Sequence, residues 1–139
     1  MKHCFTFRYY DEFTATFEIE GDWTLHDLAA YCITEVAGFD FDHAFGFYDN
    51  IRNPYKSVEK YTIFADRGEP EDGEPGVQKT KVSEVFEPEK RMILLFDYGD
   101  DWNFLLTCDS SEPSTKRGLT EAILSKEGTP PVQYPDHDE

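Results

Sequence analysis

A short acidic turn joins two apolar segments in the C-terminal half of the chain. Residues 96–104 read FDYGDDWNF, so three carboxylates, one glycine and the two bulky aromatic residues Tyr98 and Trp102 lie between Phe96 and Phe104. The run MILLF precedes the turn, and after it Trp102, Phe104, Leu106 and Cys108 alternate with other residues. An unbroken apolar run indicates a strand buried on both faces, and period-two alternation indicates a returning strand. The turn therefore predicts the corner of a β-hairpin.

Two more strands and one helix are predicted in the N-terminal half. Aromatic and β-branched residues alternate with polar ones over 5–9 and again over 13–19, which is typical of paired strands. Thr24 has the character of a helix N-cap, and the apolar stripe that follows continues to Val36, with Gly38 as a C-cap. We expect this helix to pack on the sheet.

The remaining segments predict shorter elements. Short strands are expected near 45–48 and 58–64, and a short helical turn over 81–86. Residues 119–124 fit either a helix or a strand. A mobile acidic loop is expected around 66–80 and an irregular, Pro-rich tail around 128–139, within a single domain spanning residues 1–139.

The order of these elements predicts an α+β fold of the β-grasp, or ubiquitin-like, type. In such a mixed sheet the first hairpin is followed by one main packed helix, and a late apolar strand pairs beside the first strand. The run 92–96 would be that late strand, and the segment after the acidic turn would add a C-terminal hairpin that extends the sheet.

Composition and charge exclude several classes of protein. Aromatic residues make up 16% of the chain, which is enough for a packed core. The formal net charge of −16 leaves no basic footprint for nucleic acid or for an anionic membrane. The N-terminus has no apolar signal core, and no apolar run reaches membrane-spanning length, so a cytoplasmic protein is expected. Three widely spaced cysteines, Cys4, Cys32 and Cys108, are expected to be reduced.

Four segments, taken in order, resemble a known family. They are TLHDL from Thr24, HAFGF from His43, FDYGDDW from Phe96 and GTPP from Gly128. Together they resemble the plasmid pRiA4b open-reading-frame-three-like family, whose members often carry transposon passenger or resolvase-like labels. The resemblance covers most of the chain and implies a ubiquitin-like core, no established reaction, and an extended conformation for 119–124.

The resemblance has two limits for function. A recombinase needs a positioned nucleophile and a DNA-binding surface, whereas this chain has a net charge of −16 and only five arginines. Many family members also continue past the Pro-Pro pair into a Glu-Asp-Cys-Gly-Gly-like stretch. Here residues 132–136 read VQYPD, so no function that depends on that cysteine is expected.

The acidic turn holds the candidate site residues. Asp97, Asp100 and Asp101 supply the oxygen ligands that Mg²⁺ or Ca²⁺ prefers, although the spacing is not that of a calcium loop. His43, beside Asp42, could join them as a base or ligand, or could simply anchor a loop. The two aromatic residues of the turn either pack over the sheet or contact a partner: they are Tyr98 and Trp102.

No motif identifies a catalytic residue or a required cofactor. Serines lie outside nucleophile-elbow contexts, no phosphate-binding loop is present, and the four histidines lack zinc-ligand spacing. The leading hypothesis is a non-catalytic protein-interaction or adaptor module for an unidentified basic protein partner. The alternative is a divalent-metal-assisted hydrolase or nuclease-like enzyme that uses the acidic turn, with weak Mg²⁺ or Ca²⁺ binding. A ubiquitin-type modifier is disfavoured, because the sequence ends DHDE and lacks a terminal Gly-Gly.

Overall fold

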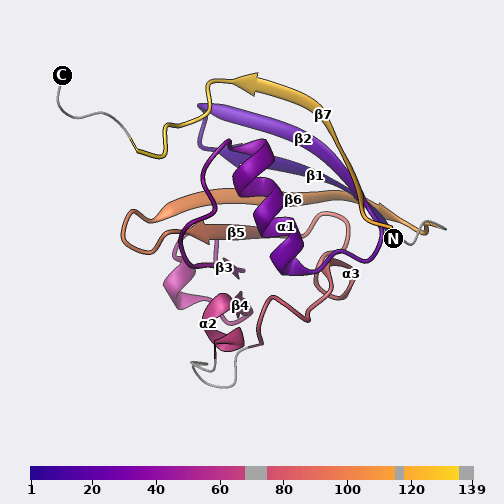
Figure 1. Cartoon of the computed structure of the whole chain (residues 1–139), viewed down its shortest axis with the longest axis horizontal. Helices are drawn as coiled ribbons and strands as arrows, with labels where there is room; N and C mark the ends of the chain where they lie inside the picture. The colour runs from indigo at the N-terminus through magenta and orange to yellow at the C-terminus, as the bar shows by residue number, and fades with distance from the viewer. Residues whose placement is uncertain (68–74, 115–117, 135–139) are drawn as a thin grey trace.

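The chain forms a single seven-stranded antiparallel sheet with short helical segments (Figure 1). This computed structural model describes residues 1–67, 75–114 and 118–134. The order across the sheet is β4-β3-β5-β6-β1-β2-β7. The strands are β1 (Lys2–Tyr9), β2 (Phe13–Glu20), β3 (Phe45–Tyr48), β4 (Lys60–Thr62), β5 (Arg91–Phe96), β6 (Trp102–Glu112) and β7 (Thr120–Gly128). The helical segments are α1 (Leu25–Tyr31), η1 (Cys32–Val36), η2 (Pro54–Lys56), α2 (Ile63–Asp66) and α3 (Val82–Val85).

The predicted β-grasp arrangement is wrong, because β5 does not pair with β1. Strand β6 lies between them, with Phe7 opposite Leu106 and Leu94 opposite Phe104, and all pairings between named strands are antiparallel. The tight turn returns the chain directly beside β5, and the 11-residue β6 is long enough to pair with β1 on its other side. The fold is therefore a mostly β antiparallel sheet and not a mixed ubiquitin-like one.

The core lies between one face of the sheet and the helix α1, which crosses that face in Figure 1. Phe5, Phe7 and Phe17 are fully buried there, as the alternation of the first two strands predicts. Burying each such ring stabilises the fold by about 1.5–3 kcal/mol. The predicted helix start is confirmed, because Thr24 and Asp27 form a reciprocal capping box.

Three predicted elements differ in extent from the observed ones. The helix is α-helical only to Tyr31 and continues as the π-helical segment η1. The strand predicted over 58–64 is only three residues long, since the Thr62 hydroxyl accepts a hydrogen bond from the Ala65 N–H and so starts α2. Residues 119–124 are extended, and β7 continues to Gly128.

The two segments predicted to be irregular lie partly outside the described residues, which omit 68–74 and 135–139. The described part of the acidic loop is anchored to the fold. Val77 is fully buried, and its N–H donates to a carboxylate oxygen of Asp66 at 2.7 Å. In the tail, Gln133 is also buried. The mobile loop and the single domain stay predictions.

Three further observations concern the cysteines and the membrane. Cys32 and Cys108 are buried, Cys4 is half-buried, and all three are free thiols. Burial raises the pKa of the Cys32 thiol, which keeps it protonated. Among the helices of the described residues, none has the length and apolar character needed to cross a membrane.

Candidate functional site

The acidic turn is built around Asp97, whose side chain organises the backbone. Its Oδ1 accepts hydrogen bonds from the N–H groups of Gly99 at 3.1 Å and Asp100 at 3.3 Å. Asp97 and Asp101 adopt positive φ values of 63° and 52°. Aspartate tolerates the left-handed region better than most residues because its short side chain bonds locally. The Asp97 side chain is buried, and its hydrogen bonds stabilise the conformation of the turn.

Strand pairing brings His43 beside the turn. Phe45 lies opposite Phe96, and the Asp97 N–H donates to the Ala44 carbonyl at 2.9 Å. His43, one residue earlier, therefore faces Asp97, with 3.5 Å between its Nε2 and the Asp97 Oδ2. Its other ring nitrogen, Nδ1, lies 2.7 Å from the Asp42 Oδ1. The histidine is held between two carboxylates.

These carboxylates change the protonation of His43. The hydrogen bond with Asp42 raises the pKa of His43 most. Burial opposes this increase, and the charges of Asp97, Asp42 and Asp100 add to it. The Tyr134 hydroxyl donates to the Asp42 Oδ2 at 2.7 Å. That bond, together with the one from His43, lowers the pKa of Asp42. The exposed imidazole therefore keeps its proton to a higher pH than an ordinary histidine does.

The C-terminal tail completes this group, which sequence reasoning missed. The Gln133 side chain accepts from the Asp40 N–H at 2.7 Å and donates to the Asp40 carbonyl at 3.0 Å. It thereby fixes the segment that carries Asp42 and His43. Nothing in the local pattern of the tail signals these contacts, because the partners are more than 90 residues apart in sequence.

The other predicted site residues point elsewhere. Asp101 Oδ1 accepts from the Tyr55 hydroxyl at 2.5 Å, which raises the pKa of Tyr55 to about 12. The Tyr98 hydroxyl lies 2.6 Å from that of Tyr48. Asp100 is exposed at the tip of the turn. The three aspartates therefore do not converge, and the described residues contain no group of three or more His, Cys, Asp or Glu side chains arranged for a metal ion.

Trp102 is partly buried and packs against the core. Its ring stacks on Phe104 with an interplanar angle of 2° and meets Phe39 edge-on at 5.0 Å between centroids. The indole Nε1 is buried, and none of the described residues accepts a hydrogen bond from it. A buried donor without an acceptor costs free energy, which the packing of the ring must offset.

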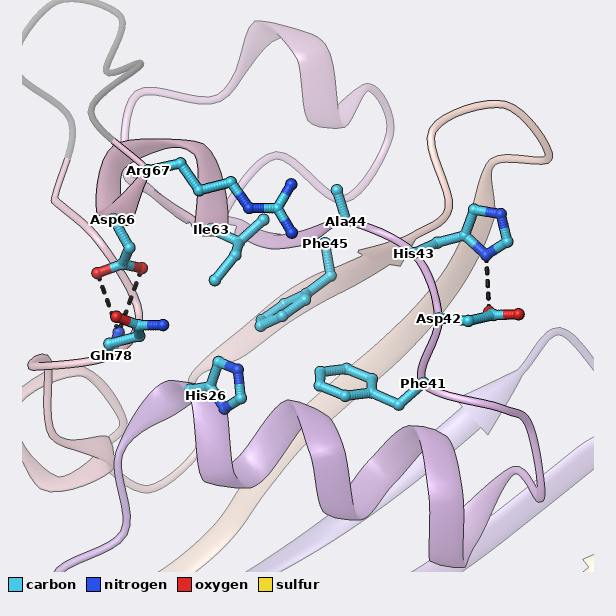
Figure 2. A pocket seen from close by; sticks show the side chains of 10 residues that line it. All are labelled: His26, Phe41, Asp42, His43, Ala44, Phe45, Ile63, Asp66, Arg67 and Gln78. Atoms are coloured by element: carbon cyan, nitrogen blue, oxygen red, sulfur yellow. Dashed lines mark hydrogen bonds and ion pairs between the residues drawn. The ribbon is translucent and has the colours of Figure 1, made fainter.

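A cavity of about 640 Å³ lies next to His43, between α1, α2 and the segment before β3. Figure 2 shows the ring of His26 close to the rings of Phe41 and Phe45, and Arg67 on the opposite wall. His26 meets both phenylalanine rings edge-on at 5.6 Å. The lining combines apolar side chains with one guanidinium, two imidazoles, the carboxylates of Asp42 and Asp66 and the amide of Gln78. Such a cavity can bind a ligand.

The two edges of the sheet differ in a way that the sequence did not reveal. Strand β4 is three residues long, and Thr62 bridges to Gly76 beyond it, which covers that edge. Strand β7 is nine residues long and exposed throughout, and no other described strand pairs with its outer edge. In the pairing of β7 with β2, Ser125 lies opposite Thr16 and Ile123 lies opposite Phe17, so Leu124 forms a bulge without a partner residue on β2. The side chain of Leu124 is 55% exposed. A long open edge is a ready template for another strand.

A comparison with solved structures supports the fold. The chain is similar to the crystal structure of the protein of unknown function MM3350 from Methanosarcina mazei Go1, with a TM-score of 0.60 and 18% sequence identity. The match covers 88% of this chain and 68% of that chain. This likeness concerns the fold alone. A search of curated proteins found no match.

A comparison with family models identifies the group to which the chain belongs. The model described as plasmid pRiA4b ORF-3-like protein matches residues 11–133. This range contains the segments from Thr24, His43, Phe96 and Gly128 on which the resemblance in sequence rested. Because the match spans most of the chain, the protein is a member of the plasmid pRiA4b ORF-3-like family.

Proposed function

We propose that this protein is a non-catalytic interaction module that binds an extended, basic segment of a partner protein along β7. The observation that carries the proposal is the fully exposed outer edge of this nine-residue strand. Strand addition uses such an edge, because the unpaired N–H and C=O groups supply affinity and the alternate side chains supply specificity. Strands average about 5–6 residues, so β7 offers an unusually long edge.

Side chains along β7 support a partner that is both apolar and basic. Ile123 and Leu124 are 39% and 55% exposed, which provides contact area on the strand. The acidic residues of β7 and the adjacent β2 are Glu18, Glu20, Glu121 and Glu127. Lys126, the cation of β7, donates to the Glu35 carbonyl at 3.0 Å and so turns toward this chain. Lysine or arginine on the incoming strand would complement this charge.

The same charges argue against a second copy of the chain as the occupant. Antiparallel pairing of two β7 strands would place the acidic residues of one copy close to those of the other copy. Like charges on neighbouring strands are destabilising, and the net charge of −16 on each copy adds long-range repulsion. We therefore assign the edge to a basic partner.

A peptide-binding experiment tests this proposal. The probe is a fluorescent peptide of alternating lysine and valine with the same length as β7, and its control is the matching peptide of glutamate and valine. We expect the lysine peptide to raise fluorescence anisotropy on binding and to slow hydrogen exchange of β7 amides. Glu127→Lys should weaken binding roughly two- to fivefold, whereas Glu87→Lys, an equal charge change on an exposed loop residue, should not.

Two results would contradict the proposal. One is protection of amides in another element, for example β4, while β7 exchanges as before. The other is equal binding of the two peptides, which would show that charge does not select the partner. Sedimentation at increasing protein concentration supplies the check on self-pairing, and a β7-dependent dimer would overturn the assignment of the edge to another protein.

A further inference from the structure

The sheet face opposite α1 carries arginines that the proposed function does not use. Arg8 on β1 and Arg91 on β5 both point to this face, since their register partners Leu105 and Thr107 are the alternate, non-core residues of β6. Arg52 follows β3 and lines the same face. Three of the five arginines in an otherwise acidic chain thus gather over three neighbouring strands.

These arginines border two adjoining hollows. One, of about 380 Å³, is lined by Arg8, Arg52 and the apolar side chains of Ile93 and Leu105. The other, of about 330 Å³, is lined by Arg8, Arg91, Thr107 and Leu105. The two share Arg8 and Leu105 and therefore adjoin, and we refer to them together as the groove. Each lies within the range of about 300–1,000 Å³ that small-molecule sites occupy.

The cations of the groove are free to bind an external anion. No carboxylate of the described residues lies within 4.0 Å of the guanidinium nitrogens of Arg8, Arg52 or Arg91. The acid on the groove wall is Asp109, and its Oδ2 accepts from the Thr6 hydroxyl at 2.6 Å. Exposed arginines that face a common floor, with threonine hydroxyls beside them, supply the donors that carboxylates and phosphates require.

The apolar floor adds a second requirement on the ligand. Leu105 lies opposite Ile93, and Ile93 lies opposite Tyr48, so an apolar row crosses three strands directly beside Arg8. We propose that this groove binds a small organic anion, in which a carboxylate or phosphate meets Arg8 and Arg91 and an apolar body lies on Leu105 and Ile93. The site is separate from the β7 edge, which lies beyond β2.

Titration with phenyl phosphate, followed by NMR of the amides in β1, β5 and β6, tests the assignment. We expect saturable shifts at Thr6, Leu105 and Thr107. Arg8→Gln and Arg91→Gln should each weaken binding about tenfold, because each removes a charge-assisted contact. Both residues are exposed, so the variants should fold, and thermal melting checks that they do. Arg67→Gln, an equal charge change in the cavity beside His43, is the matched control and should bind as the parent does.

Three further measurements refine the chemistry. Benzoate, used in parallel, distinguishes a carboxylate from a phosphate ligand, and saturable binding of either at these amides supports the site. Asp109→Asn should tighten binding, since it removes the opposing charge on the groove wall. Inorganic phosphate and phenol should each bind more weakly than phenyl phosphate. Equal affinity for inorganic phosphate would overturn the role of the apolar floor. Shifts that do not saturate, or that depend on Arg67 instead, would overturn the site.

Discussion

At the scale of single residues, the pKa of His43 should lie above the ordinary histidine value of 6.5, and the pKa of His3 should lie below it. The hydrogen bond that His43 donates to Asp42, with the charges of Asp97 and Asp100, raises the pKa of His43. Burial lowers the pKa of His3, and the N-terminal ammonium adds to that effect. An NMR titration of the imidazole protons measures both values in one sample.

The consequences for stability follow from proton linkage. The pKa of His43 is higher in the folded state, so its contribution is fully present below about pH 6.5 and is lost as the pH rises through the folded pKa. For His3 the pKa is lower in the folded state, so stability is lost as the pH falls through that value. The difference in unfolding free energy between the parent and His43→Gln should therefore shrink at higher pH.

A variant of the turn separates these causes. Asp97→Asn keeps a side-chain oxygen for the Gly99 and Asp100 N–H groups but removes the charge near His43. It should lower the pKa of His43 and leave that of His3 in place. A His43 that titrates at or below the ordinary value in the parent protein would contradict the described geometry.

The site was predictable from sequence only where neighbouring strands carry it. The prediction placed His43 and Asp97 in one candidate group, and the pairing of Phe45 with Phe96 brings them together. The bonds from Tyr55 to Asp101 and from Tyr134 to Asp42 join segments 46 and 92 residues apart. No periodicity encodes such contacts, because they depend on how the finished sheet is folded.

At the scale of elements, Gly128 determines how β7 leaves the sheet. Its φ is +85°, and a Cβ added there would overlap the backbone oxygen of Glu12. Gly128→Ala should lower the unfolding free energy by about 1–3 kcal/mol, the usual cost of a strained left-handed residue, or more because of the overlap. Urea unfolding measures this change.

Gly118→Ala is the matched control, because an added Cβ there meets no atom of the described residues within 4 Å and the φ is not in the left-handed region. It should leave stability nearly unchanged. Equal effects of the two substitutions would show that the conformation at Gly128 is not what limits the pairing of β7.

Local chemistry explains which elements could be predicted. Alternating phenylalanines specified β1 and β2, and the Thr24 cap specified the start of α1. The end of β4 was missed, because the Thr62 cap that begins α2 competes with strand propensity in the same residues. The pairing of β1 with β6 was also missed, since an alternating pattern identifies a strand but does not indicate which strand pairs with it. That choice between β5 and β6 decided the fold.

At the scale of the whole molecule, the net charge of −16 should make stability depend on salt. Repulsion among carboxylates opposes the compact state, and the screening length falls from about 30 Å at 0.01 M salt to about 3 Å at 1 M. The urea midpoint should therefore rise with sodium chloride. A midpoint that falls would mean that attractive ion pairs dominate the folded surface.

Magnesium chloride at matched ionic strength provides the control for divalent cations. Screening alone predicts that the midpoint follows ionic strength whichever salt is used. A larger rise with Mg²⁺, abolished by Asp100→Asn, would instead identify cation binding at the acidic turn.

The position of β6 has a consequence for the time course of synthesis. Strands β1 and β2 lie on one side of it and β5, β3 and β4 on the other, so β6 joins the two halves of the sheet. A ribosome makes the N-terminal hairpin long before residues 102–112 emerge. Until then its apolar edge has no neighbour, and the nascent chain must wait for this late segment or rely on a chaperone. The strand that excludes a ubiquitin-like fold thus also delays completion of the sheet until residues 102–112 have been made.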